Sequence, residues 1–283
     1  MDPHSESNSR LKVFLENPSK ALWTLAIPIM FGMGIQTLYN LVDMIFIGKL
    51  GGQAITGIAF NMPLFFLVLG LTMGLGTGVT ASIARFIGQE NKKQADNSAE
   101  HAVFMAAIIS VFLSLIGLMF GKTILTFFGA KGEILNLGWE YLRVMCIGMP
   151  FMIFSGFFRS ILAGEGDMKF PMMIAGLGTV LNIILDPIFI FELESYGGFG
   201  FGLGIAGAAM ATVISQVIVF FVFIYMLFFK DHSYITFRLR DFSFSTDIIW
   251  DIVKIGLPAS LSMVVMAIGQ GVFNKILIHF SKK

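Results

Sequence analysis

Charge is scarce in this sequence of 283 residues. Asp, Glu, Lys and Arg make up 13% of it, whereas soluble domains carry about 25%. The net charge is +1, so there is no basic field of the kind that binds nucleic acid, and no nucleic-acid partner is expected. Hydrophobic residues reach 56% and the mean hydropathy is +0.81, more apolar surface than one water-soluble core can hide. A lipid bilayer hides such surface, so the composition predicts a membrane protein.

Cysteine is nearly absent as well. Cys146 is the single cysteine, which excludes a disulfide framework and a cysteine-based metal site. The four histidines show no pair with metal-ligand spacing, and no Ser/His/Asp arrangement stands out, so we expect neither an enzyme nor a cofactor. Residues 1–20 are polar and lack a cleavable signal sequence, and the first apolar run is expected to act as the insertion signal.

Seven apolar runs are long enough to cross a bilayer as helices, which takes about 20 residues. They cover approximately residues 22–47, 55–83, 102–125, 141–162, 171–191, 205–229 and 255–278. Residues 241–254, between the last two runs, carry Ile248, Ile249, Ile252 and Val253 at helical spacing beside charged side chains. This pattern is typical of an amphipathic helix on the membrane surface, and a polar linker is the alternative.

Basic residues favour one side of the predicted membrane. On that side we count Arg10, Lys12, Lys20, Arg85, Lys92, Lys93, Arg159, Lys169, Lys230, Arg238, Arg240 and Lys254. The opposite loops hold only Lys49, Lys122 and Lys131. Because cytoplasmic loops are enriched in Lys and Arg, the bias predicts a multi-pass protein of the cell membrane with a cytoplasmic N-terminus.

A long-range repeat links the first and seventh runs. Pro28 and Pro258 each open an apolar run, and a glutamine follows in both, Gln36 and Gln270. Six spans and a restart are the pattern of a transporter built from two six-helix halves. The predicted organisation is a cytoplasmic segment (1–20), a six-helix lobe (21–230), a linker (231–254) and the first helix of an incomplete second lobe (255–283).

Two acids, Asp43 and Asp186, interrupt otherwise apolar spans. An acid at the membrane centre costs about 2.5–3.5 kcal/mol, and such residues usually serve ions, protons or substrate. A helix-end cap or a pair with a basic residue such as Arg143 is the alternative. Each acid has polar neighbours on its own helical face. These are Asn182 and Thr179 for Asp186, and Gln36, Tyr39 and Asn40 for Asp43.

Proline directly follows the second acid. Pro187 cannot donate to the carbonyl of Ile183, so that carbonyl is freed beside Asp186. A freed carbonyl, a carboxylate and an amide oxygen are suitable ligands for a hard cation.

Two further motifs suggest other chemistry. Gly164 to Asp167 matches the GxGD pattern of intramembrane aspartyl proteases, with Asp43 as the second acid. Gly74 to Gly78 resembles a phosphate-binding loop, but it lies within an apolar span and no lysine follows. Close helix packing through small residues explains these glycines better.

Several segments together resemble one family, the multidrug and toxic compound extrusion (MATE) transporters. Residues 27–43 are similar to its first helix, 162–167 to its loop between helices four and five, 181–190 to its fifth helix and 204–212 to its sixth. The likeness runs from about Ala21 to the C-terminus and is closest to the archaeal and DinF-like branch.

The resemblance implies an all-α membrane fold and a coupling site for H⁺ or Na⁺ at Asp43, Asn182, Asp186 and Thr212. It also places Tyr141 near that cavity. Family members exchange a cation for organic, often cationic or amphipathic, substrates by alternating access between two lobes. This chain holds one lobe and one helix, so a C-terminal lobe is the partner expected for function, beside membrane lipid and a small organic substrate. A lipid-linked oligosaccharide flippase is the alternative transporter, although flippase cavities tend to carry basic residues.

Overall fold

The structure is a computed structural model that describes residues 18–192, 200–230, 233–237 and 242–281, without some side chains of the first helix and of the last turns. Its helices are α2 (Pro18–Gly48), α3 (Gly52–Ala59), α4 (Met62–Gly88), α5 (Lys92–Phe127), α6 (Gly132–Gly164), α7 (Lys169–Ile190), α8 (Gly204–Phe228) and α9 (Thr246–Ser281). Six of them, α4 to α9, are long and apolar enough to cross a membrane. The predicted all-α membrane fold is confirmed.

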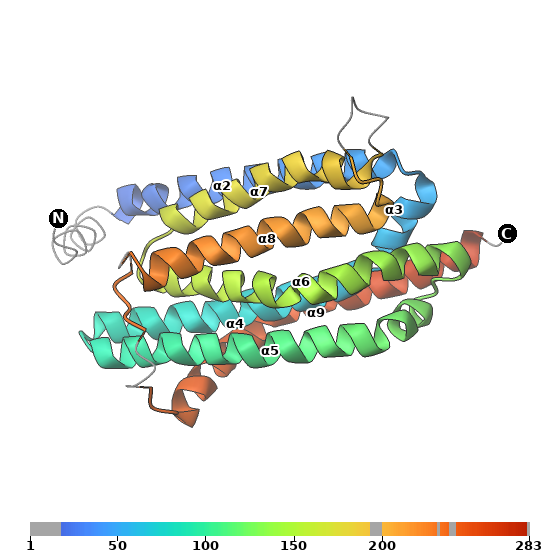
Figure 1. Ribbon diagram of the computed structural model, residues 1–283. Helices are drawn as coiled ribbons and strands as arrows, with labels where there is room; N and C mark the ends of the chain where they lie inside the picture. The colour runs from blue at the N-terminus through green and yellow to red at the C-terminus, as the bar shows by residue number, and fades with distance from the viewer. Residues whose placement is uncertain (1–17, 193–199, 231–232, 238–241, 282–283) are drawn as a thin grey trace.

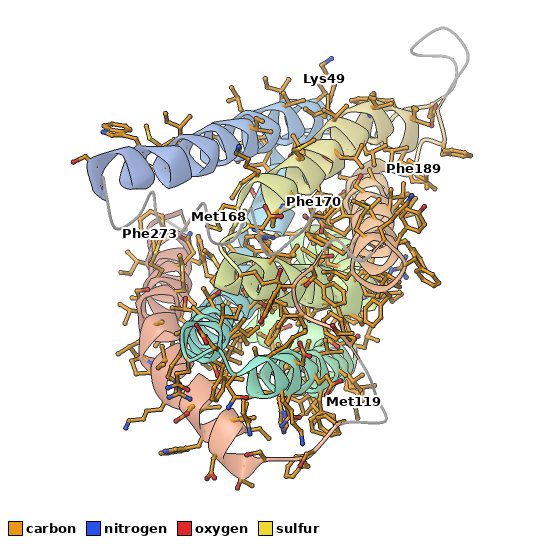
Figure 2. The ribbon with its side chains drawn as sticks, turned by 90° about the vertical axis from the view of Figure 1, so that its left-hand side faces the viewer. Lys49, Met119, Met168, Phe170, Phe189 and Phe273 are labelled. Atoms are coloured by element: carbon orange, nitrogen blue, oxygen red, sulfur yellow. The ribbon has the colours of Figure 1, made fainter. Side chains whose placement is uncertain are left out.

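The long helices run side by side and α6 lies at their centre (Figures 1 and 2). It contacts α3, α4, α5 and α8, whereas α2 is attached mainly through α7. We name the two ends of the bundle by a residue in a turn. The Lys49 end holds the turns 49–51 and 128–131, and the Glu165 end holds the turns 89–91 and 165–168 with the α8–α9 connection.

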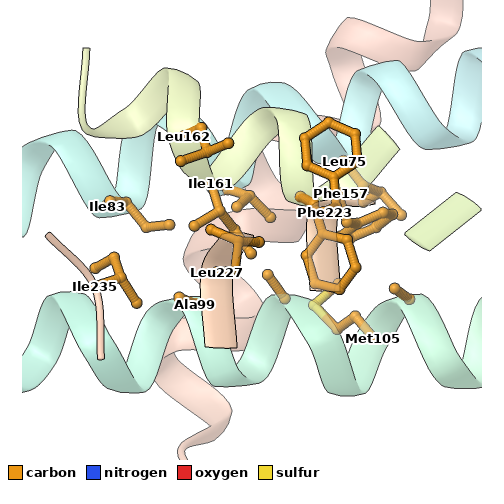
Figure 3. Packing of buried hydrophobic residues seen from close by; sticks show 14 of the residues in the cluster. Leu75, Ile83, Ala99, Met105, Phe157, Ile161, Leu162, Phe223, Leu227 and Ile235 are labelled. Carbon is orange, nitrogen blue, oxygen red and sulfur yellow. The ribbon is translucent and has the colours of Figure 1, made fainter. Parts of the chain in front are cut away.

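The largest cluster of buried side chains joins α4, α5, α6 and α8. Leu75, Ile83, Met105, Phe157 and Phe223 are among its members (Figure 3). Lipid tails are as apolar as these side chains, so van der Waals packing, rather than exclusion of water, holds such helices together. This cluster gives the lobe a rigid body against which the outer pair, α2 and α7, is placed.

The run 55–83, expected as one span, is divided between two helices. α3 ends at Ala59 and α4 begins at Met62. The Asn61 side chain lies at the break, where Nδ2 donates to the carbonyls of Gly57 at 2.9 Å and Gly138 at 3.1 Å. Pro63 occupies the first turn of α4, where its missing N–H is tolerated. The break between the two helices is therefore stabilised by Asn61 and followed by Pro63 at the start of α4. Apolar composition alone does not predict it.

The amphipathic stretch before the seventh span is helical, but it is not a separate surface helix. α9 continues without interruption from Thr246 to Ser281. Ile248 and Ile252 are buried in the core cluster, so their face packs on the protein and not on the membrane. An ion pair between Arg85 Nη2 and Asp251 Oδ2, at 2.6 Å, fixes the polar side of the same helix.

Glycines bring α4 and α9 into backbone contact. A Cβ at Gly74 would lie 2.6 Å from both the carbonyl oxygen of Gly256 and the amide nitrogen of Ser260. At Gly78 it would meet the backbone of Ile252. Each glycine thus marks a place where no larger residue fits, which confirms close packing and not a phosphate loop as the role of this motif.

Candidate functional site

The two intramembrane acids lie near the Lys49 end, on neighbouring helices. α2 carries Asp43 and α7 carries Asp186, and the two helices pack together. Asp186 is completely buried, and its carboxyl group interacts electrostatically with that of Asp43. Within the described part of the chain neither acid forms an ion pair with Lys or Arg. Pairing with a basic residue therefore does not explain the two acids.

Asn182 connects α7 to α8 beside Asp186. With the amide nitrogen turned toward the acid, Nδ2 donates to Asp186 Oδ2 at 2.9 Å. The amide oxygen then accepts from the Thr212 hydroxyl at 3.2 Å and from its backbone N–H at 3.0 Å. We assign this orientation because it gives both ends of the amide a partner. Asn182 and Thr212 are each at least nine-tenths buried, so the three residues form a dry polar cluster.

One oxygen of this group is left over. Asp43 Oδ1 is buried and has no hydrogen-bond partner in the described part of the chain. Orphan acceptors of this kind are rare because burying a polar atom without a partner is costly. The two carboxylates are hard oxygen ligands, and a proton or an alkali cation between them would offset their repulsion. Pro187 lies in the last turn of α7, next to Asp186.

The remaining predicted cavity residues are placed in part. Thr179 is 8% exposed and continues the stripe of Asn182 and Asp186 along α7. Tyr141 packs against a cluster that contains Ile47 of α2 and Ile190 of α7. Gln36, Tyr39 and Asn40 fall within α2, but their side chains lie outside the described residues.

A second polar cluster, at the Glu165 end, was not anticipated. The Glu165 carboxylate accepts from the hydroxyl of Ser233 and from the N–H groups of Tyr234 at 3.0 Å and Ile235 at 3.1 Å. Burial raises the pKa of Glu165, and these three donors partly oppose that effect. The residue lies in the α6–α7 turn, outside the spans, and holds the α8–α9 connection to the lobe. Its three donors are remote in sequence, so no local spacing revealed the cluster.

Replacing Glu165 by Ala is expected to loosen this connection. Hydrogen bonds to a charged acceptor contribute about 1.5–3 kcal/mol, so the amides of Tyr234 and Ile235 should exchange hydrogen at least about tenfold faster. Mass spectrometry of peptides covering 233–237 measures the change. Asp247→Ala, an exposed acid in the first turn of α9, is the control and should leave these amides unchanged. Equal protection in both variants would contradict the assignment.

The GxGD pattern does not form a pair of acids. Asp167 lies in the turn before α7, where Oδ1 accepts from the N–H of Phe170 at 3.1 Å. Asp186 is near the other end of the same helix, and a rise of about 1.5 Å per residue separates the two by about 28 Å. Because Asp43 interacts with Asp186, it is remote from Asp167. The geometry required for an aspartyl protease is absent from these residues.

Arg159 is one of the basic residues that predict the cytoplasmic side, and the interpretation that it lies in the loop between the fourth and fifth spans is wrong. α6 continues to Gly164, so Arg159 lies inside the helix. The sequence between Ser160 and Gly164 contains no proline, and Glu165 takes the C-cap position. The helix therefore has no reason to end earlier.

Known proteins share both the sequence and this arrangement. A family model described as MatE matches residues 28–188. The multidrug export protein MepA of Staphylococcus aureus (strain MRSA252) is 30% identical over 277 residues, which is 96% of this chain and 59% of the relative. The chain therefore spans little more than half the length of this relative.

Solved structures agree with the sequence comparison. A MOP superfamily transporter from Pyrococcus furiosus is 41% identical with a TM-score of 0.82, over 89% of this chain and 54% of the other. An outward-facing multidrug resistance MATE family transporter is 39% identical with a TM-score of 0.81, over 89% and 54%. The MatE model covers more than half of this chain, and the helices are arranged as in solved members of the family. The chain therefore belongs to the MATE family of transporters.

Proposed function

We propose that this chain is the N-terminal lobe of a cation-coupled exporter of organic compounds. Asp43, Asn182, Asp186 and Thr212 would bind the coupling H⁺ or Na⁺. The observation that carries the proposal is the dry polar cluster: a fully buried Asp186, hydrogen-bonded through Asn182 to Thr212, faces a second acid with a buried and unpartnered oxygen. The packing of α2, α7 and α8 does not by itself require these polar side chains.

The physics of coupling follows from charge. A cation that binds between Asp43 and Asp186 relieves their repulsion and lets α2 pack against α7. One charge crossing 100 mV is worth about 2.3 kcal/mol. This energy drives a conformational cycle only if the cation binds the two states of the lobe unequally. The junction of α2 with α7 is the natural place for such a difference, because α2 has few other contacts.

The substrate and the need for a partner lobe rest on similarity. MepA is a multidrug export protein, and by analogy the substrates are organic, cationic or amphipathic compounds. Because this chain covers 59% of MepA, we propose that a second lobe completes the transport path. The bias of Lys and Arg supports a cytoplasmic position for the Glu165 end. The seven predicted runs hold few basic residues, Lys122, Arg143, Arg159 and Lys275, which gives little support to the oligosaccharide flippase alternative.

Export by the chain alone is expected to be undetectable. In cells that lack their own exporters, ethidium efflux should equal that of the empty vector, because one lobe cannot enclose and release a substrate alternately. Fusion within α9 to the C-terminal lobe of MepA should restore efflux driven by a sodium or a proton gradient. Collapsing both gradients is the control. Efflux from the lobe alone would contradict the two-lobe proposal, and gradient-independent efflux would contradict cation coupling.

A further inference from the structure

The membrane-spanning part of α6 contains one charged residue. Glu133, Glu140 and Arg143 occupy the first third of the helix, so the run of about 20 apolar residues that crosses the bilayer must be 144–163. Arg159 is the only charged residue in that run. It lies four residues before the end of that run, about 6 Å inside it. A charge within a span is costly and, in transporters, often marks a substrate or ion pathway.

Helical periodicity shows which way Arg159 faces. It follows Tyr141 by five turns and so lies on the same face of α6. Tyr141 packs against a cluster to which α2 and α7 contribute Ile47 and Ile190, together with residues of α3 and α8. Two other faces of α6 are occupied. Gly156 and Ser160 contact α4, and the rings of Phe154 and Phe158 contact Phe220 of α8. The stripe of Arg159 is therefore directed to the side of α6 on which α2 and α7 lie.

Lipid contact does not explain this orientation. Arg143 and Ile147 are the exposed residues on the opposite side of α6, between α5 and α8, and Ile147 is 62% exposed. At 100° per residue they are about 120–160° around the helix from Arg159. An arginine that reached for headgroups from the lipid-facing surface would share their side.

No acid in the described part of the lobe neutralises Arg159. The side chain is exposed, and it forms no ion pair or hydrogen bond with any described residue. Glu165 is engaged by the α8–α9 connection. Gly148 packs against Val213, next to Thr212 of the cation site. The 11 residues from Gly148 to Arg159 place the Cα of Arg159 about 16 Å from that level, farther than its side chain reaches, so it does not pair with Asp43 or Asp186.

We propose that Arg159 binds an anionic group of the transported molecule, a carboxylate or a phosphate. The inference rests on the proposed function and adds to its organic cations a class of amphipathic substrates that carry a negative group. The planar guanidinium fork binds both oxygens of such a group at once, which a lysine cannot do. Asp43 and Asp186, near the Lys49 end, hold the coupling cation. The acid pair and Arg159 therefore bind different ligands.

A pair of dyes that differ in one group tests the proposal. Rhodamine B carries a carboxylate, and its ethyl ester has the same aromatic body without it. Fluorescence polarisation measures binding of each dye to the full chain in phosphatidylcholine nanodiscs. The wild type should bind rhodamine B at least about tenfold more tightly than the ester. Arg159→Gln should remove this preference without changing the affinity for the ester, and Arg159→Lys should retain part of it.

Two controls make the outcome decisive. Arg143→Gln, on the same helix but the opposite side, should bind both dyes as the wild type does. Repeating the titrations with phosphatidylglycerol tests the headgroup as the source of the anion. The proposal is overturned if the wild type shows no preference, or if Arg159→Gln alters only the response to phosphatidylglycerol. The affinity for the ester measures binding of the aromatic body, on which the proposed function depends. The difference in affinity between the two dyes measures the contribution of Arg159.

Discussion

Replacing Asp186 by Asn is expected to reduce ethidium export by the two-lobed protein to the level of the empty vector, while the amount of protein in the membrane is unchanged. The amide nearly preserves the volume of the side chain, so Asn182 and Thr212 keep their packing. It removes one of the two negative charges that attract the cation. With one carboxylate left, the cation loses its strongest ligand and the gradient no longer acts on the lobe. Efflux per unit of membrane protein measures the effect.

Asp43→Asn should behave in the same way, because its unpartnered oxygen belongs to the same site. Asp167→Asn is the matched control: the same substitution, made beside the same helix, at the opposite end. Its carboxylate caps a turn and should not influence coupling. Normal gradient-driven export by both Asp186→Asn and Asp43→Asn would refute the site.

Replacing Gly78 by Leu is expected to destabilise the lobe by about 3 kcal/mol, since overpacking costs about 1–3 kcal/mol and sometimes more. The new Cβ would meet the carbonyl oxygen, the carbonyl carbon and the Cα of Ile252. These are backbone atoms, which cannot rotate away as a side chain can. α9 must therefore move as a body and give up the burial of Ile248 and Ile252 against the core. Unfolding by SDS, followed through tryptophan fluorescence, measures the loss.

Gly176→Ala provides the comparison for this substitution. Gly176 lies inside α7, and nothing stands within 4 Å of the position its Cβ would occupy. Alanine there should be neutral or stabilise by up to about 1 kcal/mol, because Gly is the poorer helix former. If Gly78→Leu proved as stable as the wild type, the close approach of α9 to α4 would be wrong.

Local periodicity made the α7 half of the site predictable. Asn182 and Asp186 are four residues apart, so a helix must stack them, and their hydrogen bond follows from that spacing alone. The glycines of α4 could likewise be predicted to be packing residues, because they recur within an apolar run. The spans themselves required only a count of apolar residues.

Local periodicity does not predict contacts between segments that are distant in the sequence. Thr212 is 30 residues from Asn182, on another helix, and only the family resemblance pointed to it. Glu165 meets its three donors some 70 residues later in the chain. The break at Asn61 was hidden because hydropathy does not distinguish one long helix from two. Arg159 lies inside α6 although it is charged, because a charge alone does not mark the end of a helix.

The most direct test of the cation site is hydrogen exchange of the chain in nanodiscs, with and without Na⁺ and at two pH values, corrected for the intrinsic exchange rates. The site predicts that Na⁺ or acid pH increases protection of peptides covering residues 179–190 and 208–216 in the wild type. It predicts that the Asp43→Asn/Asp186→Asn double variant responds to neither cation. A wild type that responds to neither, or a double variant that responds as the wild type does, would contradict the account.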